Sequence, residues 1–578
     1  MRFNSQEFPV KRACGKRICA AVVLMLGTSF SALGGRNMPM LNWAGKQKVV
    51  NHHNEVPFHV TERKWTFGED ALSENMVIHG DNLTALKSLL PKYEGRVKCI
   101  YIDPPYNTGN EGWVYNDNVN DPQIKKWLGE VVGKEGEDFS RHDKWLCMMY
   151  PRLRLLQKLL ADDGVIFISI DDTEQAYLRM ICDEIFGIQN FIAQLIVQRS
   201  TNGMGDKKGF SRNHDYCICY QKSEFAKFYG RTPNAEYLAR FDKEDGFGRY
   251  KIDGILMKKG AGSRREDSPT LFFPVYYSPK TGEVTLEPKE GFLERFPIKS
   301  NGTEGRWTWG RTKIEKESYR LFASSNGTIY IKDYLTEDRR MKMKTILQDS
   351  SYLTDRATNE MISIFEGKAF DTPKPVGLIY DLLDVVTKDG DLVLDAFAGS
   401  GTTAHAVLKL NKEDGGNRKF ILVEMMDYAE SITAERVKRV ISGYGEGSKA
   451  VEGTGGSFGY YELGAPLMIG ENLNEELSVD KIREYVWYTE TMGMGNGNGE
   501  LGMGNGDDPY LLGVANDTAY YFCYEKSKAV TLDRTLLKKL KTKAGRYVIY
   551  ADICLLDEAE LERFRITFKK IPRDIVRL

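Results

Sequence analysis

Cysteine and histidine are scarce in this chain of 578 residues and are scattered along it. The nine cysteines include no CxxC pair and share no repeated spacing, and the seven histidines form no ligand cluster. These absences favour a reduced, cytoplasmic compartment and argue against a structural zinc site, so no metal is expected. Beyond the first 40 residues, no run approaches the ~20 apolar residues that a membrane span needs.

The first 40 residues have the shape of a secretory signal. Basic residues precede the apolar run from Ile18 to Gly27, and small residues follow it. Met38 and Met40 lie just downstream, however, and the sequence from Leu41 onward reads as the start of a domain. We therefore expect residues 1–40 to be an over-extended start, and the protein to be cytoplasmic without membrane contact.

The formal net charge of −1 conceals an uneven distribution along the chain. Residues 191–370 carry 31 Lys+Arg against 24 Asp+Glu, which makes this block +7 and the remainder −8. A basic central block is compatible with a polyanionic partner. A solvated, loop-rich surface explains the same charge equally well.

Short apolar runs alternate with helical patterns in two blocks of the sequence. In the first block we expect strands at 76–79, 97–102 and 165–170, and helices at 83–90, 145–160 and 173–186. In the second we expect strands at 392–395 and 420–424, and helices at 376–386 and 402–410. This alternation predicts an α/β fold whose parallel, doubly wound, Rossmann-like sheet takes strands from both blocks.

The remaining segments predict the domain organisation. Two core halves are expected at 41–193 and 373–465, separated by an irregular insertion at 194–372 that is rich in Gly, Tyr and Phe. A small C-terminal domain is expected at 466–578, with helices at 532–541 and 555–564. Within it, residues 492–508 have the Gly/Asn/Met composition of a flexible tether.

The first motif with chemical content is Asp103-Pro104-Pro105-Tyr106, directly after the apolar run 97–102. Open α/β sheets bind ligands where their strands end. Prolines stiffen the turn and leave carbonyl oxygens as acceptors, while Asp103 adds a carboxylate and Tyr106 a flat ring. Together these groups suit an exocyclic amine on an aromatic base, with Tyr106 stacked on that base. The alternative is a rigid proline turn with a capping aspartate.

The second motif runs from Asp395 through Phe397, Gly399 and Gly401 to Thr402, where an apolar strand turns into a helix. Glycines let the backbone approach a ligand closely, and a helix N-terminus presents free N–H groups. The turn lacks the third Gly of GxGxxG and the Lys of a P-loop, so dinucleotide and NTP binding both lose support. Glu424 ends the next strand, where an acid can bind ribose hydroxyls or merely cap a helix.

These residues resemble the amino-group DNA methyltransferases, which use S-adenosyl-L-methionine. The order of the motifs, with a long insertion between them, is similar to the β class, a circular permutation of the class I methyltransferase fold. Over residues 43–463 the match is nearest to modification subunits of Type III restriction-modification systems. The resemblance implies that Asp103, Pro104, Pro105 and Tyr106 are catalytic. It also implies that the cofactor is bound by Asp81, Lys374, Asp395, Phe397, Gly399, Gly401, Thr402 and Glu424, although Asp81 reads equally well as a helix N-cap.

The resemblance also implies a substrate and partners. The substrate would be double-stranded DNA, with the insertion as target-recognition domain and direct methyl transfer to the N6 amine of a flipped-out adenine. Basic and aromatic residues of the insertion are candidates for DNA contact: Arg199, Lys207, Lys208, Arg212, Arg264, Arg265, Arg306, Trp307, Trp309 and Arg311. Core packing is the favoured alternative for the two tryptophans.

Several alternatives stay open at this point. The target base could be cytosine, methylated at N4, although that chemistry more often pairs with Ser in place of Asp103. The chain could also serve mainly as a DNA-binding specificity subunit for a nuclease. A homodimer and a restriction (helicase/nuclease) subunit are the further partners that the sequence leaves open.

Overall fold

The computed structural model describes residues 40–70, 73–108, 139–202, 209–491 and 508–573. Nearly all of the segment expected to be an over-extended start, and nearly all of the expected tether, therefore lie outside the described residues. None of the helices in the described ranges has the length and apolar character that crossing a membrane requires.

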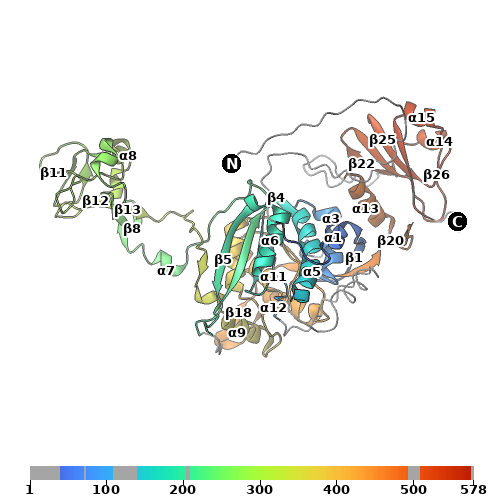
Figure 1. The fold of residues 1–578 in the computed structure, drawn as a ribbon, viewed down its shortest axis with the longest axis horizontal. Coiled ribbons are helices and arrows are strands. Elements are labelled where there is room, and N and C mark those ends of the chain that lie inside the picture. Colours follow the sequence, from blue (N-terminus) through green and yellow to red (C-terminus); the bar gives the residue numbers. More distant parts are fainter. Residues whose placement is uncertain (1–39, 71–72, 109–138, 203–208, 492–507, 574–578) are drawn as a thin grey trace, which may run out of the picture. The chain divides into compact units, whose positions relative to one another are not determined.

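Ten strands form the central sheet (Figure 1), in the order β1-β19-β2-β16-β15-β3-β4-β6-β5-β14. Their bounds are β1 His59–Gly68, β19 Ser457–Pro466, β2 Met76–His79, β16 Lys419–Glu424, β15 Leu392–Asp395, β3 Val97–Ile102, β4 Leu160–Ile170, β6 His214–Gln221, β5 Phe191–Gln198 and β14 Ile346–Leu347. The strands from β19 to β4 run parallel, whereas β1 and β6 run against their neighbours. The expected α/β fold with both blocks in one sheet is confirmed, but the sheet is mixed rather than wholly parallel.

Helices cover both faces of this sheet. They are α3 Asn82–Tyr93, α5 Phe139–Leu159, α6 Gln175–Phe186, α9 Thr354–Phe365, α10 Val376–Val386, α11 Thr402–Asp414 and α12 Glu435–Ser442. Cys219 of β6 belongs to the core shared with α10, α11 and α12. Its neighbour Tyr220 points to the opposite face and contacts Phe186 of α6, with ring centroids 5.6 Å apart. Because both faces are covered, all residues of β3 are buried.

The insertion forms small antiparallel sheets of its own. Its elements are α7 Ala235–Leu238, β7 Lys243–Asp245, β8 Gly248–Ile255, β9 Val275–Tyr277, β10 Val284–Thr285, β11 Leu293–Arg295, α8 Arg311–Glu317, β12 Leu321–Ala323 and β13 Ile329–Tyr334. Trp307 and Trp309 are buried in its core, and Trp307 Nε1 donates to the carbonyl of Phe273 at 2.8 Å. The core-packing alternative therefore describes both tryptophans, and their rings are withdrawn from solvent. Most of β5, and all of β6 and β14, lie within 194–372 but belong to the central sheet.

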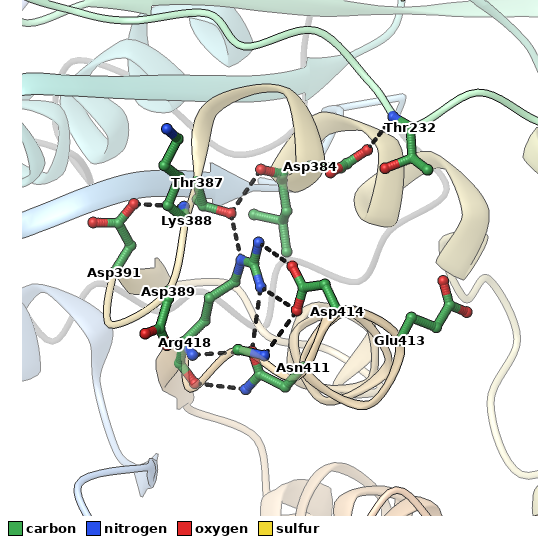
Figure 2. Close-up of polar contacts among 12 residues, drawn as sticks. Thr232, Asp384, Thr387, Lys388, Asp389, Asp391, Asn411, Glu413, Asp414 and Arg418 are labelled. Carbon is green, nitrogen blue, oxygen red and sulfur yellow. Dashed lines mark hydrogen bonds and ion pairs between the residues drawn. The ribbon is translucent and has the colours of Figure 1, made fainter. Parts of the chain in front are cut away.

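Two segments, 229–232 and 340–341, connect the insertion to the core, and we call them the neck. They pair with each other through an isolated antiparallel bridge. Both are fastened to α10 by the buried Asp384, whose carboxylate accepts from the backbone N–H of Thr232 and from Arg340 Nη2, each at 2.6 Å. Figure 2 shows the bond to Thr232. The neck thereby holds the C-terminal end of α10.

The same C-terminal end of α10 is fastened to α11 by Arg418, through Thr387 just past the helix (Figure 2). Its Nε donates to Thr387 Oγ1 at 2.9 Å, and its Nη2 lies 2.8 Å from Asp414 Oδ2. The guanidinium is almost fully buried, so both partners are needed to satisfy its donors. The C-terminal end of α10 is therefore held both by the neck and by α11.

The C-terminal region contains a four-stranded sheet in the order β22-β23-β25-β27. Its elements are β20 Met468–Ile469, β21 Asn472–Leu473, α13 Val479–Thr491, β22 Leu511–Ala515, β23 Thr518–Phe522, β24 Thr531–Leu532, α14 Arg534–Leu537, β25 Arg546–Ala551, β26 Ile553–Cys554, α15 Glu558–Arg563 and β27 Ile566–Lys570. The two helices expected here are shorter than predicted. Asp533 and Asp557 accept hydrogen bonds from first-turn N–H groups and so fix where α14 and α15 begin.

Candidate active site

The two predicted motifs lie at the same edge of the central sheet. Strands β3 and β15 are parallel neighbours, with Cys99 opposite Val393. Residues 103–106, which we call the proline turn, follow β3, and residues 395–402, the glycine loop, end β15 and lead into α11. The strand order changes direction between these two strands, which is where open α/β sheets bind ligands.

A cavity of about 670 Å³ lies between the proline turn and the glycine loop. Of the predicted site residues, it is lined by Asp103, Pro104, Pro105, Tyr106, Lys374, Asp395, Phe397, Gly399, Thr402 and Glu424. Asp81 and Gly401 are not among its lining residues. One continuous space therefore contacts both motifs, as a transfer reaction between two bound molecules requires.

The proline turn presents two acceptors at the wall of the cavity. Asp103 Oδ2 lies 2.7 Å from Lys374 Nζ, while Oδ1 is buried and receives no hydrogen bond from the described residues. The carbonyl of Pro105 is already taken, because Trp145 Nε1 donates to it at 2.7 Å. The described residues leave the carbonyl of Pro104 without a donor. An unsatisfied buried acceptor is costly, so a ligand that supplies N–H donors here is stabilised.

Lys374 connects the proline turn to the glycine loop. Its Nζ lies 4.8 Å from the centroid of the Tyr106 ring, within reach of a cation–π contact. Its backbone carbonyl accepts from Thr402 Oγ1 at 3.2 Å. Burial, with the nearby Asp103 carboxylate, raises the pKa of Tyr106 well above its usual range. The Tyr106 hydroxyl therefore stays neutral, and its ring is a wall rather than a base.

Asp395 holds the glycine loop through two hydrogen bonds. Its Oδ1 accepts from the backbone N–H of Phe397 at 3.0 Å, and its Oδ2 accepts from Thr403 Oγ1 at 2.5 Å. Burial raises the pKa of this carboxyl to about 7. Asp395 thus links the end of β15 to the first turn of α11.

The loop takes its shape from two glycines. Gly399 and Gly401 have φ of 50° and 80°, the left-handed region that favours glycine. The N–H of Gly399 donates to Glu424 Oε2 at 2.7 Å. A Cβ on Gly401 would lie 3.0 Å from the carbonyl oxygen of Thr433, which leaves little room for a side chain. Sequence alone indicated the glycines, and the backbone angles explain them.

A buried arginine holds the start of α11 from behind the cavity. Arg436 is fully buried, and its Nη1 donates to Ser400 Oγ at 2.9 Å and to Thr402 Oγ1 at 2.8 Å. The first-turn N–H groups of a helix have no partners within the helix and favour anions. The loop therefore presents a rigid, electropositive helix terminus to the cavity.

Glu424 ends β16, and Asp81 follows the neighbouring strand β2. Both Glu424 oxygens accept backbone N–H groups, from Gly399 and from Met426, and burial raises the pKa of the carboxyl. Asp81 caps α3 by accepting from the N–H of Thr84 at 2.8 Å. The capping alternative thus describes Asp81, and its role toward a cofactor stays a prediction, as does that of Glu424.

Other cavity residues were not predicted from sequence. They include Ser169, Asp171, Asp172, Phe370, Met426 and Tyr428. Ser169 lies near the end of β4, and Asp171 and Asp172 directly follow it, which is the same signal that identified Asp103 after β3. Phe370 and Tyr428 pack at near right angles with ring centroids 5.5 Å apart, and no local pattern marks these two loop residues.

Residues of β6 and its neighbour complete the cavity wall. His214, Asp215 and Tyr216 line it. Burial raises the pKa of Asp215, although Lys374 and Arg199 oppose that shift. Arg199 Nη1 lies 3.4 Å from Asp215 Oδ1. Arg199, predicted as a DNA contact, therefore lies at the cavity itself.

Comparison with known proteins identifies the family of this chain. Residues 97–435 match the family model described as DNA methylase, and this range contains both motifs and the insertion. The chain belongs to this family.

The similar proteins are modification enzymes of bacteria and phage. The Type II methyltransferase M.KpnI of Klebsiella pneumoniae is 42% identical over 387 residues, which are 65% of this chain and 89% of that protein. The EcoPI Mod subunit, from a Type III restriction-modification enzyme of Escherichia phage P1, is 37% identical, over 66% of this chain and 63% of the subunit. The StyLTI Mod subunit of Salmonella typhimurium is 34% identical, over 62% and 53%. The chain thus spans little more than half the length of these Type III subunits.

Proposed function

We propose that this protein is a site-specific DNA methyltransferase that moves a methyl group from S-adenosyl-L-methionine to the N6 amine of a flipped-out adenine. One observation carries the proposal. The proline turn and the glycine loop follow adjacent parallel strands and line one cavity. Loops on opposite faces of the sheet could not have served one transfer reaction.

The base would enter beside the proline turn. Asp103 and the carbonyl of Pro104 would accept the two N–H hydrogens of the target amine, which favours a tetrahedral nitrogen with an available lone pair. Tyr106 would stack on the base, a contact worth about 1–3 kcal/mol per base in single-stranded binders. These contacts partly offset the few kcal/mol that extrusion from the duplex costs.

The glycine loop fits the cofactor. The start of α11 suits a carboxylate, the left-handed glycines bring the backbone close, and Phe397 offers an apolar surface in the cavity. Glu424 and Asp81 are the acids placed to contact the ribose and the adenine end. S-adenosyl-L-methionine supplies a methyl group that its sulfonium sulfur already activates. The protein chiefly aligns nitrogen, carbon and sulfur, which can contribute about 7–11 kcal/mol.

The methyl transfer needs no covalent enzyme intermediate. The amine nitrogen forms the new bond to the methyl carbon as the carbon–sulfur bond breaks, and the nitrogen then releases its extra proton to solvent. The described cysteines include none in either motif. Asp103, paired with Lys374, orients the amine throughout.

The insertion supplies the recognition surface in this proposal. It lies between the neck segments, and Arg264, Arg265, Arg306 and Arg311 belong to it. Basic side chains contact phosphates and base edges, so these are the candidates for sequence reading. We further propose that the chain acts as the modification and specificity subunit of a restriction-modification system, with a restriction subunit as partner and homodimerisation as a second assembly. The names of its relatives support this assignment.

Sequencing and mass spectrometry together test the proposal. DNA from cells that express the full chain, and from cells that express Asp103→Ala, is digested to nucleosides and also read by long-read sequencing. We expect N6-methyladenine at one sequence motif only with the intact protein. N4-methylcytosine instead would establish the cytosine alternative, and unmodified DNA would support a role in binding alone.

A further inference from the structure

A buried acid stands behind the proline turn, and the proposed reaction does not use it. Glu174 directly precedes α6 and has no exposed surface. Its Oε1 accepts from Asn107 Nδ2 at 2.5 Å and lies 2.7 Å from His142 Nδ1. Its Oε2 is buried and receives no hydrogen bond within the described part of the chain. Burying a carboxylate costs desolvation free energy, so the position of Glu174 needs an explanation.

Asn107, the residue that Glu174 holds, directly follows the proline turn. Asn107 follows Tyr106 and has φ of 57°, in the left-handed region. That conformation costs a residue with a side chain about 1–2 kcal/mol, although Asn tolerates it better than most. The Asn107 side chain is buried as well. Its bond to Glu174 therefore stabilises a strained backbone next to the ring expected to stack on the base.

Helix α5 supports the same turn from a second point. His142, which lies beside Glu174, is three residues before Trp145 on this helix, and Trp145 donates to the carbonyl of Pro105. Residues one turn apart on a helix lie on the same side. The turn is thus fixed at Pro105 by α5 and at Asn107 by the acid at the start of α6. Between these two points stands Tyr106.

We propose that Glu174 is a positioning residue for methyl transfer, which it supports by holding Asn107 and so fixing the place of Tyr106 and of the Pro104 carbonyl. This inference rests on the proposed function. A carboxylate serves because one oxygen must accept from two side chains, Asn107 and His142. Gln at this position keeps one acceptor oxygen. Its N–H₂ group would take the place of Oε2, which is buried and has no hydrogen-bond partner among the described residues. Gln should therefore restore the role in part.

The test compares Glu174→Ala with the removal of another glutamate side chain, near the C-terminal end of α6. Glu184→Ala is the control, because Glu184 is also bonded to two side chains, Lys46 and Tyr150, away from the turn. For Glu174→Ala we expect kcat for DNA methylation to fall at least tenfold, with the Kd for S-adenosyl-L-methionine within twofold of wild type. Amide hydrogen exchange in the peptide 97–108 should become faster in Glu174→Ala and stay unchanged in Glu184→Ala. Glu174→Gln should recover much of the kcat.

A double-mutant cycle with Asn107→Ala distinguishes positioning from a general loss of stability. If Glu174 acts through Asn107, the double variant should be no slower than the slower single variant. Multiplying losses, or a Glu174→Ala kcat equal to that of Glu184→Ala, would overturn the inference. Wild type and Asp103→Ala are assayed alongside. A wild type that methylates no DNA defeats the proposed function, and the role of Glu174 with it, whereas with an active wild type a failure of these expectations concerns Glu174 alone.

Discussion

Lys374 places its ammonium nitrogen 2.7 Å from Asp103 Oδ2, and so joins the segment before α10 to the turn after β3. Both side chains are about one-fifth exposed, at 22% each. Lys374 compensates the charge of the carboxylate, while the buried second oxygen, Oδ1, receives no hydrogen bond from the described residues. We expect its loss to affect the chemistry more than the fold.

Replacing Lys374 by Met should lower the methylation rate at least tenfold, because Asp103 loses its compensating charge beside the target amine. Lys374→Arg keeps the charge and should retain more activity. Single-turnover methylation of genomic DNA, with cofactor at saturation, measures this. Equal rates for the Met and Arg variants would show that the charge is not what matters.

Replacing Asp103 by Ala should lower methyl transfer by two orders of magnitude or more, a loss typical of removing one group that orients the reacting atoms. Cofactor and DNA binding should stay within a fewfold of wild type. Asp163→Ala is the control, since Asp163 pairs with Lys98 near the start of β4 and does not line the cavity. Turnover by Asp103→Ala at the level of this control would defeat the assigned role.

Replacing Gly401 by Val should weaken cofactor binding at least tenfold, measured by calorimetry. The new side chain would meet the Thr433 carbonyl and would force a β-branched residue into the left-handed region. Gly415→Val is a close control. Gly415 has φ of 71° at the other end of α11, with nothing within 4 Å of an added Cβ. Similar affinities for the two variants would count against the loop as a cofactor site.

The Asp395 carboxyl should make stability depend on pH. Its folded-state pKa of about 7 lies above the value near 4 of an unfolded chain, so the folded protein keeps a proton there that the unfolded chain has lost. The free energy of unfolding should therefore fall as the pH rises from about 4 to 7, by at most about 4 kcal/mol, and level off above. Denaturant unfolding of wild type and Asp395→Asn, at several pH values, isolates this contribution. Parallel curves for the two proteins would refute it.

Replacing Arg340 by Gln should destabilise the neck by about 2 kcal/mol, because the Asp384 side chain, 4% exposed, keeps its charge and loses its ionic partner. Arg320→Gln removes a partly exposed pair with Glu317 inside the insertion and should cost less than about 1 kcal/mol. Chemical denaturation compares the two variants. An equal loss would mean that the neck contributes no more than a surface ion pair.

Local sequence predicted the parts of the site that a short segment defines. The apolar run 97–102 followed by Asp103, and the run 392–395 followed by glycines, each contain a complete strand and its turn, so their bounds agree with β3 and β15. Both blocks alternate in the same way, which predicted their common sheet.

Long-range pairing could not be read in the same way. The contact of Lys374 with Asp103 and the packing of Phe370 on Tyr428 join segments far apart in the chain. Strand β6 runs antiparallel to both of its neighbours, β4 and β5, so the expectation of a parallel sheet does not hold at this edge. The C-terminal helices begin later than expected because Asp533 and Asp557 cap them, and Leu532, before the first cap, belongs to β24.

The chain leaves the core and re-enters it through one paired neck, and this topology has an evolutionary consequence. Everything between the two neck segments can be exchanged as a cassette without altering the order of strands in the central sheet. If the insertion reads the target as proposed, its recombination would change the target preference while the residues at the ends of β3 and β15 are inherited unchanged.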